Sequence, residues 1–237
     1  MPLADPYQAS LAELSASTAR LVAAVRELDD VALGEPSLLP GWTRGHVVAH
    51  LARNADGLVN LATWARTGVE TPMYAGGREG RDAEIERDAG RPAPEQRADT
   101  EAASRRLAAA LAALPLAVHG AELRLGSGAS VPAGSLPLRR IREVEIHLVD
   151  LAAGYRPTDW PLAFAERTLD ELTPSLSGSA VGLLRDPGTG RSWDLAPGRP
   201  ALTGPAQELL AWLVGRSDGT VLSFDRTGSV PSAPPWL

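Results

Sequence analysis

The chain has 237 residues, of which 44% are hydrophobic and 22% are charged, and these values are ordinary for a soluble globular protein. This length allows one large domain or two modest ones, each with its own core. The net charge of −6 argues against nucleic-acid binding, because there is no excess of cations to neutralise phosphates.

The first two predicted helices lie in the N-terminal third of the chain. Leucine and valine recur at three- and four-residue spacing over 5–33, which predicts one long helix. Gly and Pro interrupt the pattern, and Thr43 then offers an N-cap for a second helix that runs to about Arg66. Gly68 is expected to end that helix.

A long connection, a third helix, a hairpin and a fourth helix follow. The connection over 69–94 contains a short helical candidate at 79–87, and the third helix is predicted over 94–114. Two short apolar runs flank Gly126–Ser127–Gly128, which is typical of a small hairpin with strands at 122–125 and 129–131. The fourth helix begins at Ser135 or Leu136 and ends at Ala153, before Gly154.

Four amphipathic segments with one long crossover predict a four-helix bundle, a fold that builds metal sites from inward-facing side chains. We place this domain at 1–156. A linker at 157–161 begins a small C-terminal α+β domain, 157–237. Within that domain the pattern predicts helices at 161–172 and 205–214 and strands at 181–185, 192–195 and 221–224.

The fourth helix carries Glu143 and His147, which are four residues apart and project from the same face. His46 and His50 repeat this spacing in the second helix. One imidazole from the second helix, added to the Glu–His pair, gives three nitrogen and oxygen ligands, the usual protein complement of a catalytic zinc with one open position. Both imidazoles together would close the site with four ligands, and the spacing does not decide between them.

The competing interpretation is a surface helix with an ordinary Glu–His contact. Against it, three of the four histidines of the chain fall in these two segments, and Asp150 lies one turn beyond His147, where it can orient an imidazole. Glu145 falls on roughly the opposite face from His147, so it is the poorer ligand. His119 lies in a turn flanked by Pro and Gly and is assigned no role.

The residue types that the chain lacks narrow the chemistry further. All 23 basic residues are arginine, which removes Schiff-base chemistry on lysine. There is no cysteine, which excludes a cysteine-based structural zinc site and disulfides, so any thiol must come from outside the protein.

Motifs along almost the whole chain carry a resemblance to a known family. They are SLLPGWTRGHVVAH (37–50), ETPMY (70–74), REVEIHLVDL (142–151), GRSDG (215–219) and PPWL (234–237). Together they resemble the mycothiol-dependent maleylpyruvate isomerases of actinobacteria. The first and third motifs are shared by a broader superfamily of thiol-dependent, DinB-like metal enzymes, whereas the other three are narrower and favour the isomerase.

The resemblance implies a fold and a metal site. The fold is an N-terminal DinB-like four-helix bundle that holds zinc, with a smaller α+β domain, similar to sterol-carrier folds, that closes the active-site cleft. The implied zinc ligands are His50, Glu143 and His147, with water completing the shell, and His46 is then a neighbour on the same face.

The resemblance also implies two arginines that are important for activity, and they match Arg81 and Arg216. One additional residue in the glycine run before Arg81 leaves Arg78 as a rival for the same role. Without the resemblance, Arg81 is best interpreted as a solvated loop charge. The two arginines are expected to bind carboxylate oxygens of an anionic substrate, with the bidentate geometry that arginine provides.

The reaction implied is zinc- and mycothiol-dependent cis–trans isomerisation of 3-maleylpyruvate to 3-fumarylpyruvate, a step of gentisate catabolism. The alternatives are a mycothiol S-transferase that acts on another electrophile and a non-enzymatic metal- or ligand-binding member of the superfamily. Another divalent metal could replace zinc, because the same ligands accept other first-row ions.

The expected partners are therefore a small dicarboxylate and mycothiol, with no nucleic acid and no membrane. No apolar stretch approaches the roughly 20 residues that cross a bilayer, and the N-terminus lacks the pattern of a secretory signal. A cytoplasmic location is expected. A monomer is expected too, because nothing in the sequence indicates an extended apolar dimer surface.

Overall fold

The computed structural model describes residues 5–176 and 179–233. The motif at 234–237 lies outside the described residues, as do residues 1–4, which the expectation about a secretory signal concerned. The chain divides between Ala153 and Gly154 into an N-terminal and a C-terminal unit, whereas the sequence placed the boundary three residues later.

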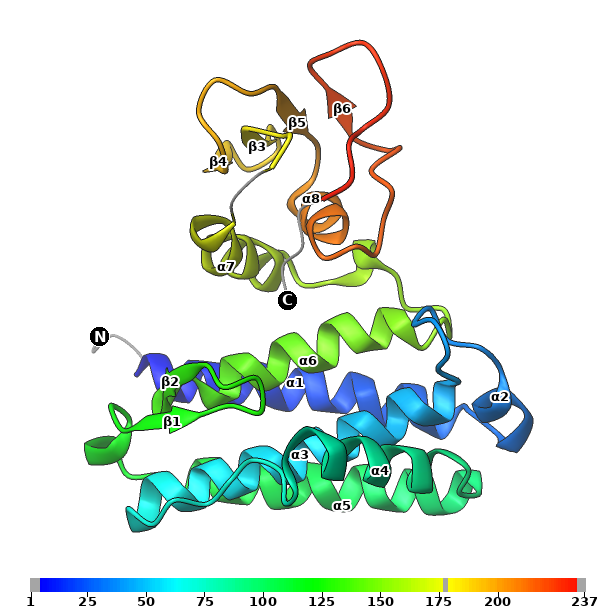
Figure 1. The fold of residues 1–237 in the computed structure, drawn as a ribbon, viewed down its shortest axis with the longest axis vertical. Helices are drawn as coiled ribbons and strands as arrows, with labels where there is room; N and C mark the ends of the chain where they lie inside the picture. The colour runs from blue at the N-terminus through cyan, green and yellow to red at the C-terminus, as the bar shows by residue number, and fades with distance from the viewer. Residues whose placement is uncertain (1–4, 177–178, 234–237) are drawn as a thin grey trace. The chain divides into compact units, whose positions relative to one another are not determined.

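The N-terminal unit is a four-helix bundle, as predicted (Figure 1). Helix α1 packs against α5 and α6, and α3 packs against the same two helices. The α3/α6 seam and the α1/α5 seam therefore lie on opposite sides of the bundle. The four helices are α1 (Pro6–Arg26), α3 (Arg44–Thr67), α5 (Ala93–Ala112) and α6 (Leu136–Asp150).

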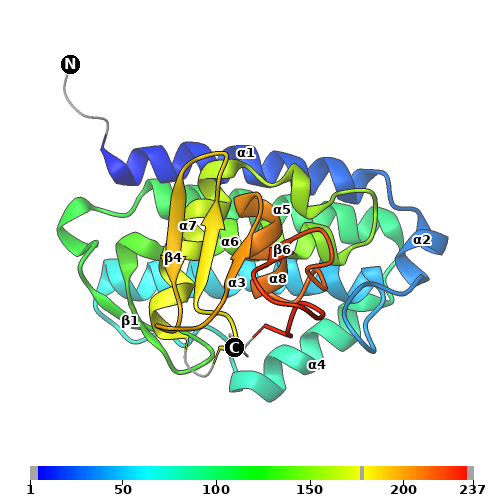
Figure 2. The same ribbon diagram turned by 90° about the horizontal axis from the view of Figure 1, so that it is seen from above.

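Smaller elements join these helices. Helix α4 (Gly77–Ala89) packs on α3 and extends the helical candidate predicted inside the long connection. Figures 1 and 2 show α2 and the β-hairpin at opposite ends of the bundle. The other elements of this unit are α2 (Asp30–Gly34), η1 (Leu116–Val118), β1 (Glu122–Arg124), β2 (Ser130–Pro132) and the single-turn η2 (Ala133–Ser135).

The ends of α3 are set by the residues that the sequence indicated. The Thr43 side chain accepts a hydrogen bond from the His46 backbone, and the His46 side chain accepts one from the Thr43 backbone. Gly68 closes the helix with a positive φ of 72°, a conformation that glycine adopts without a steric penalty. This helix therefore begins and ends as predicted.

The prediction of one helix over 5–33 was wrong, because the helix stops at Arg26 and a new one begins at Asp30. Asp29 caps the second helix by accepting a hydrogen bond of 2.8 Å from the Ala32 backbone. Val25 before the break, Leu28 within it and Leu33 after it are all buried. The apolar spacing continues through the break, so the periodicity alone did not reveal it.

Helix α6 ends at Asp150, three residues before the predicted end, and hydrogen bonds join this end to the first turn of α3 and to the loop before it. The Leu38 N–H donates to the Asp150 carbonyl at 2.9 Å. The Arg44 side chain, in the first turn of α3, donates to the carbonyls of Leu151 and Ala152 at 2.7 and 3.0 Å. These contacts help to fix the spacing between α3 and α6, the two helices that carry His50, Glu143 and His147.

The C-terminal unit is a small α+β domain with a four-stranded sheet of order β4-β3-β5-β6. Strands β3 and β5 are parallel, and the other neighbours are antiparallel. Figure 1 shows α7 and α8 together on one side of the sheet. The elements are η3 (Pro157–Asp159), α7 (Leu162–Leu172), η4 (Thr173–Ser175), β3 (Leu183–Asp186), β4 (Arg191–Asp194), β5 (Ala201–Thr203), α8 (Ala206–Leu213) and β6 (Ser223–Phe224).

The sequence analysis missed β5, a three-residue strand between Pro200 and Gly204. Its place in the centre of the sheet comes from pairing with β3 and β6, which a pattern of three residues does not show. The other strands and both helices of this unit lie where they were predicted, within a few residues. Within the described ranges, no helix has both the length and the apolar character that a membrane span requires.

Candidate metal centre

Two helices of the bundle bring three potential metal ligands together at the α3/α6 seam. Nε2 of His50, on α3, lies 3.2 Å from Oε2 of Glu143 and 3.1 Å from Nε2 of His147, both on α6. Nε2 of His147 lies 3.7 Å from the same Glu143 oxygen. These three residues form a group whose ligand atoms point at one another from two helices that are far apart in sequence.

These separations fit a small divalent cation. Two ligand atoms that each lie about 2 Å from a shared zinc ion in tetrahedral geometry are roughly 3.3 Å apart. The three observed separations of 3.1, 3.2 and 3.7 Å bracket that value. Because three ligands leave one tetrahedral position for a further molecule, the residues fit a catalytic site better than a closed structural one.

The ring of His147 is already in the tautomer that a metal ligand needs. Its Nδ1 lies 2.8 Å from Oδ2 of Asp150, which is buried. An ionised carboxylate only accepts hydrogen bonds, so Nδ1 carries the proton and Nε2 presents its lone pair to the site. This is the supporting contact that the spacing of His147 and Asp150 predicted.

The ring of His50 is held by Arg81, which comes from α4. A guanidinium nitrogen of Arg81 lies 3.0 Å from Nδ1 of His50, and another donates to Asp82 at 2.7 Å. Because a guanidinium only donates hydrogen bonds, Nδ1 of His50 accepts here and Nε2 carries the ring proton toward Glu143. A positive charge therefore borders the three ligands.

Burial and charge set the ionisation of this group. Burial, together with the neighbouring charges of His147 and Arg81, lowers the pKa of His50 to about 4, so the ring is neutral at neutral pH. Burial alone would raise the pKa of Glu143. The hydrogen bond with His50 and the electrostatic interactions with His50, His147 and Arg140 outweigh it and lower that pKa to about 2. The site thus offers a carboxylate and unprotonated imidazole nitrogen, which are the forms that bind a metal.

Further side chains line the base and wall of the centre. Arg140, one turn before Glu143, donates to the Asn54 side chain at 2.8 Å, and Asn54 lies one turn after His50. Burial and the charge of Glu143 raise the pKa of Tyr74, and the Arg81 guanidinium lies 5.9 Å from the centre of the Tyr74 ring. The ring of Trp42 lies 5.7 Å from that of His50.

Comparisons with known proteins identify the family to which this fold and site belong. The family model described as the mycothiol maleylpyruvate isomerase N-terminal domain matches residues 14–152, which is more than half of the chain. The chain belongs to that family. A solved structure titled as the mycothiol-dependent maleylpyruvate isomerase is 31% identical, with a TM-score of 0.88 and coverage of 98% of both chains.

A histidine-to-alanine mutant of a mycothiol-dependent maleylpyruvate isomerase is equally similar, with a TM-score of 0.87, 31% identity and the same coverage. The likeness therefore extends over both units of the chain, whereas the family model covers the bundle. A search of curated proteins found no match. Membership of the maleylpyruvate isomerase family rests on the family model and on the whole-chain structural similarity.

The remaining histidines and Glu145 are used elsewhere. Nδ1 of His46 lies 2.8 Å from the Thr43 hydroxyl and its Nε2 lies 3.2 Å from Glu86, so His46 caps α3 and contacts α4. Glu145 points to α1, where it accepts hydrogen bonds from Ser17 and Arg20. The ring of His119 packs against Tyr7.

Arg81 and Arg78 were the two candidates for the same activity-related arginine, and the structure places them differently. Arg81 contacts His50, whereas the side chain of Arg78 is 86% exposed and has Asp82 at 3.9 Å. Arg216 belongs to the C-terminal unit and follows α8, where its guanidinium donates to the Val214 carbonyl at 2.7 Å.

The sequence analysis missed Asn54, Tyr74 and Arg140 as members of the centre. Two of them carried a usable signal, because Asn54 and Arg140 lie one helical turn from His50 and Glu143 respectively. Tyr74 lies in the ETPMY motif, but only the packing of that loop on α3 brings it near Arg81.

Proposed function

We propose that this chain is a zinc- and mycothiol-dependent cis–trans isomerase that converts 3-maleylpyruvate to 3-fumarylpyruvate. One observation carries the proposal: His50, Glu143 and His147 converge with metal-ligand spacing in the fold of this family, in a chain that contains no cysteine. Three protein ligands leave one position of a tetrahedral zinc site, and the protein has no thiol of its own to fill it.

His50, Glu143 and His147 would hold the zinc ion. When bound, zinc supplies the Lewis acidity that keeps a thiol deprotonated near neutral pH. The neutral His50 ring and the ionised Glu143 are ready for such an ion without loss of a proton from a charged imidazole. Asp150 orients His147, and Arg140 places a positive charge behind Glu143.

The substrate chemistry explains why a thiol is needed. A carbon–carbon double bond does not rotate thermally, so it must become single for a time. The thiolate of mycothiol adds to one alkene carbon, and the π electrons move onto the conjugated carbonyl oxygen as an enolate. After rotation, the enolate electrons re-form the alkene in the trans arrangement and expel the same thiolate, so mycothiol is regenerated.

Arg81 is the residue of this chain best placed to bind the anionic substrate. Its guanidinium contacts His50, donates to Asp82 and lies 5.9 Å from the centre of the Tyr74 ring. If Nε2 of His50 is a metal ligand, the ring proton must move to Nδ1, which then cannot accept from Arg81. The guanidinium is released in this way and can bind a carboxylate or the enolate oxygen.

Arg216 enters the proposal on the resemblance alone, as a second carboxylate-binding arginine. Its guanidinium donates to the Val214 carbonyl just after α8. If the role is correct, Arg216→Lys weakens substrate use and leaves the zinc content unchanged. Equal loss of zinc and activity in that variant contradicts the assignment.

The experiment that tests the function is an isomerisation assay with 3-maleylpyruvate on zinc-loaded protein, with and without mycothiol. The proposal predicts turnover to the trans diacid only when mycothiol is present, with mycothiol recovered unchanged. Release of a mycothiol adduct in place of the trans product indicates a transferase. No turnover of a protein that carries zinc and binds mycothiol indicates a binding protein.

A further inference from the structure

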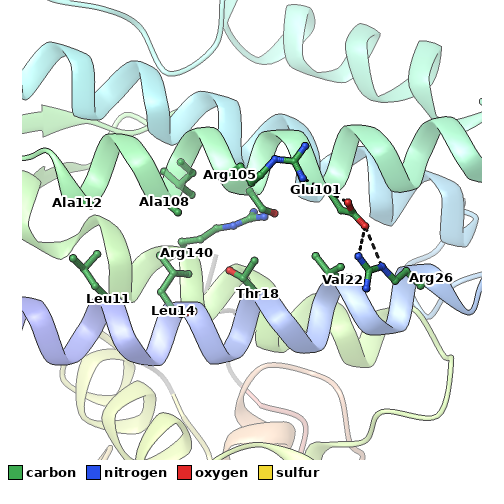
Figure 3. Close-up of a pocket in the computed structure, with 13 residues that line it drawn as sticks. Leu11, Leu14, Thr18, Val22, Arg26, Glu101, Arg105, Ala108, Ala112 and Arg140 are labelled. Atoms are coloured by element: carbon green, nitrogen blue, oxygen red, sulfur yellow. Dashed lines mark hydrogen bonds and ion pairs between the residues drawn. The ribbon is translucent and has the colours of Figure 1, made fainter.

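A cavity lies in the bundle at the α1/α5 seam, on the opposite side from the metal centre. It has a volume of about 350 Å³, which is within the range of small-molecule sites. Its walls are mostly aliphatic and come from both helices: Leu11, Leu14 and Val22 from α1, and Leu107, Ala108 and Ala112 from α5. Figure 3 shows these helices on either side of the cavity.

Arg140 of α6 forms part of the lining of this apolar space. In Figure 3 its side chain extends into the gap between α1 and α5. Only 2% of the residue is exposed, and one guanidinium nitrogen donates to Asn54. Among residues 5–176 and 179–233, no carboxylate lies within 4 Å of the guanidinium in an ion pair.

A buried guanidinium without a counter-ion is unusual, because a buried charge is costly unless an opposite charge pairs with it. Burial lowers the pKa of Arg140 to about 10, which still leaves it charged at neutral pH. The negative groups that favour its charge, Glu143 and Asp56, act from beyond ion-pair distance. The local charge balance therefore leaves room for an anion.

A second polar group in the cavity lacks a partner. The hydroxyl oxygen of Ser104, on α5, is buried and forms no hydrogen bond within the described part of the chain. Ser15 and Thr18 add two hydroxyl-bearing residues to the lining. At the rim, by contrast, Glu101 is satisfied by Arg26 at 2.8 Å and by Arg105 at 3.6 Å.

We propose that the α1/α5 cavity is a binding site for an apolar monocarboxylate, whose carboxylate pairs with Arg140 and Ser104 while its hydrocarbon part lies between the aliphatic walls. A single buried cation fits one carboxylate better than a phosphate or a diacid, which need several donors. Arg140 is shared with the metal centre, but the cavity lies at the opposite seam, and the proposal does not depend on the proposed isomerase activity.

Octanoate is a suitable probe, with 1-octanol as the matched control because it has the same chain without the charge. Calorimetry on the zinc-loaded protein is expected to show saturable binding of octanoate, and binding of octanol weaker by about tenfold or more, the usual contribution of a charged hydrogen bond. The same loss is expected for octanoate with Arg140→Met, which keeps an unbranched side chain of similar length.

Arg140→Met removes a buried charge and can also perturb the fold, so a second pair of variants tests the place of binding. Ala108→Phe fills the cavity from an exposed wall position and is expected to abolish octanoate binding. Ala109→Phe is the matched control, because Ala109 is exposed on the same helix and outside the lining. It is expected to bind octanoate as the unaltered chain does.

Any of the following results would overturn the proposal. One is the absence of saturable octanoate binding, and another is octanol binding as tight as octanoate. The third is octanoate binding that survives Ala108→Phe. Sedimentation that shows a dimer broken by Ala108→Phe, with no octanoate binding in the unaltered chain, also overturns it and assigns the seam to a second copy.

Discussion

Two carboxylates on α6, Glu143 and Glu145, are two residues apart and serve different seams of the bundle. Glu145 faces α1, where the Ser17 hydroxyl donates to it at 2.6 Å and Arg20 at 2.5 Å. Glu143 faces α3 and contacts the rings of His50 and His147. One helix thus places the same side chain in two chemical settings.

The difference lies in what satisfies each carboxylate. Arg20 is a permanent cation, so Glu145 is neutralised within the protein and its pairing contributes to folding. Among the residues that the structure describes, no arginine forms an ion pair with Glu143; its oxygen lies instead beside Nε2 of His50 and of His147, and the three ligand atoms face a common point. The α3/α6 seam therefore selects a cation from solution, whereas the α1/α6 seam contains its own.

The largest expected effect is a loss of bound zinc when Glu143, but not Glu145, is replaced. Glu143→Gln keeps the shape of the side chain and removes its charge, so zinc affinity is expected to fall by more than the roughly 10–100-fold that loss of a supporting group costs. Isomerase turnover is expected to fall with it. Metal analysis after dialysis against a zinc buffer measures the change, with Glu145→Gln as the matched control that keeps zinc. Equal zinc in both variants would refute the assignment.

Replacing Glu145 is expected to have the opposite pattern: the fold loses stability and the zinc content does not change. Glu145→Ala removes the carboxylate that accepts hydrogen bonds from Ser17 and Arg20, and breaking such a buried pair costs about 3 kcal/mol of unfolding free energy. We take the lower end of the usual range because a third of the Arg20 side chain is exposed. Urea unfolding measures this change, and zinc content is expected to stay the same. A drop in zinc without a drop in stability would show that the roles of the two residues are reversed.

Acid is expected to weaken the imidazole-containing seam. The pKa of His50 is about 4 in the folded chain, against about 6.5 when unfolded, so protons bind the unfolded state first as the pH falls below 6.5. Stability is lost from about pH 6.5 downward, and the loss is complete near pH 4. At pH 5 it amounts to about 2 kcal/mol relative to neutral pH in metal-stripped protein.

The comparison for this prediction is His50→Gln, which retains a polar side chain that does not titrate. Its loss of unfolding free energy between pH 7 and pH 5 is expected to be smaller by that amount. The depressed pKa of Glu143 acts in a separate window, because its contribution is lost only as the pH falls from about 4.5 toward 2. Identical pH profiles for the two proteins would argue against a neutral, buried His50.

The smallest expected effect distinguishes two arginines of α4 near the same seam. Arg81→Gln is expected to lower kcat/KM for maleylpyruvate by about ten- to a hundredfold, the contribution of a charged hydrogen bond, without loss of zinc. Arg78→Gln is expected to change neither, since its side chain points to solvent. Kinetics of the two variants side by side measure this. A larger loss with Arg78→Gln would assign the role to the rival residue.

The bundle could be predicted because its signals are local. Thr43 caps the start of α3 with its side chain, and Gly68 ends the helix with a positive φ. Both residue types are typical of these positions, so the sequence alone indicates the two ends. The break between α1 and α2 could not be predicted by periodicity, because Val25, Leu28 and Val31 continue the apolar spacing through it. Strand β5 depends on two partners that are distant in sequence.

The metal centre also combines features that the local sequence predicts with features that depend on contacts between distant residues. The spacing of Glu143 and His147 on one helix was visible, but the choice of His50 over His46 came from the resemblance, and the structure supplies the geometry that the spacing lacked. The pairing of Arg140 with Asn54 joins two helices, and the choice of Arg81 over Arg78 depends on where α4 begins. Neither can be derived from the spacing of residues along one helix.

The most direct test of the central claim is zinc-edge X-ray absorption on the zinc-loaded protein before and after addition of mycothiol. The account predicts only nitrogen and oxygen neighbours at first, and one sulfur neighbour at about 2.3 Å after addition. Because the chain has no cysteine, that sulfur can be assigned to the added thiol. A zinc shell that stays free of sulfur while the enzyme turns over with mycothiol would contradict the account.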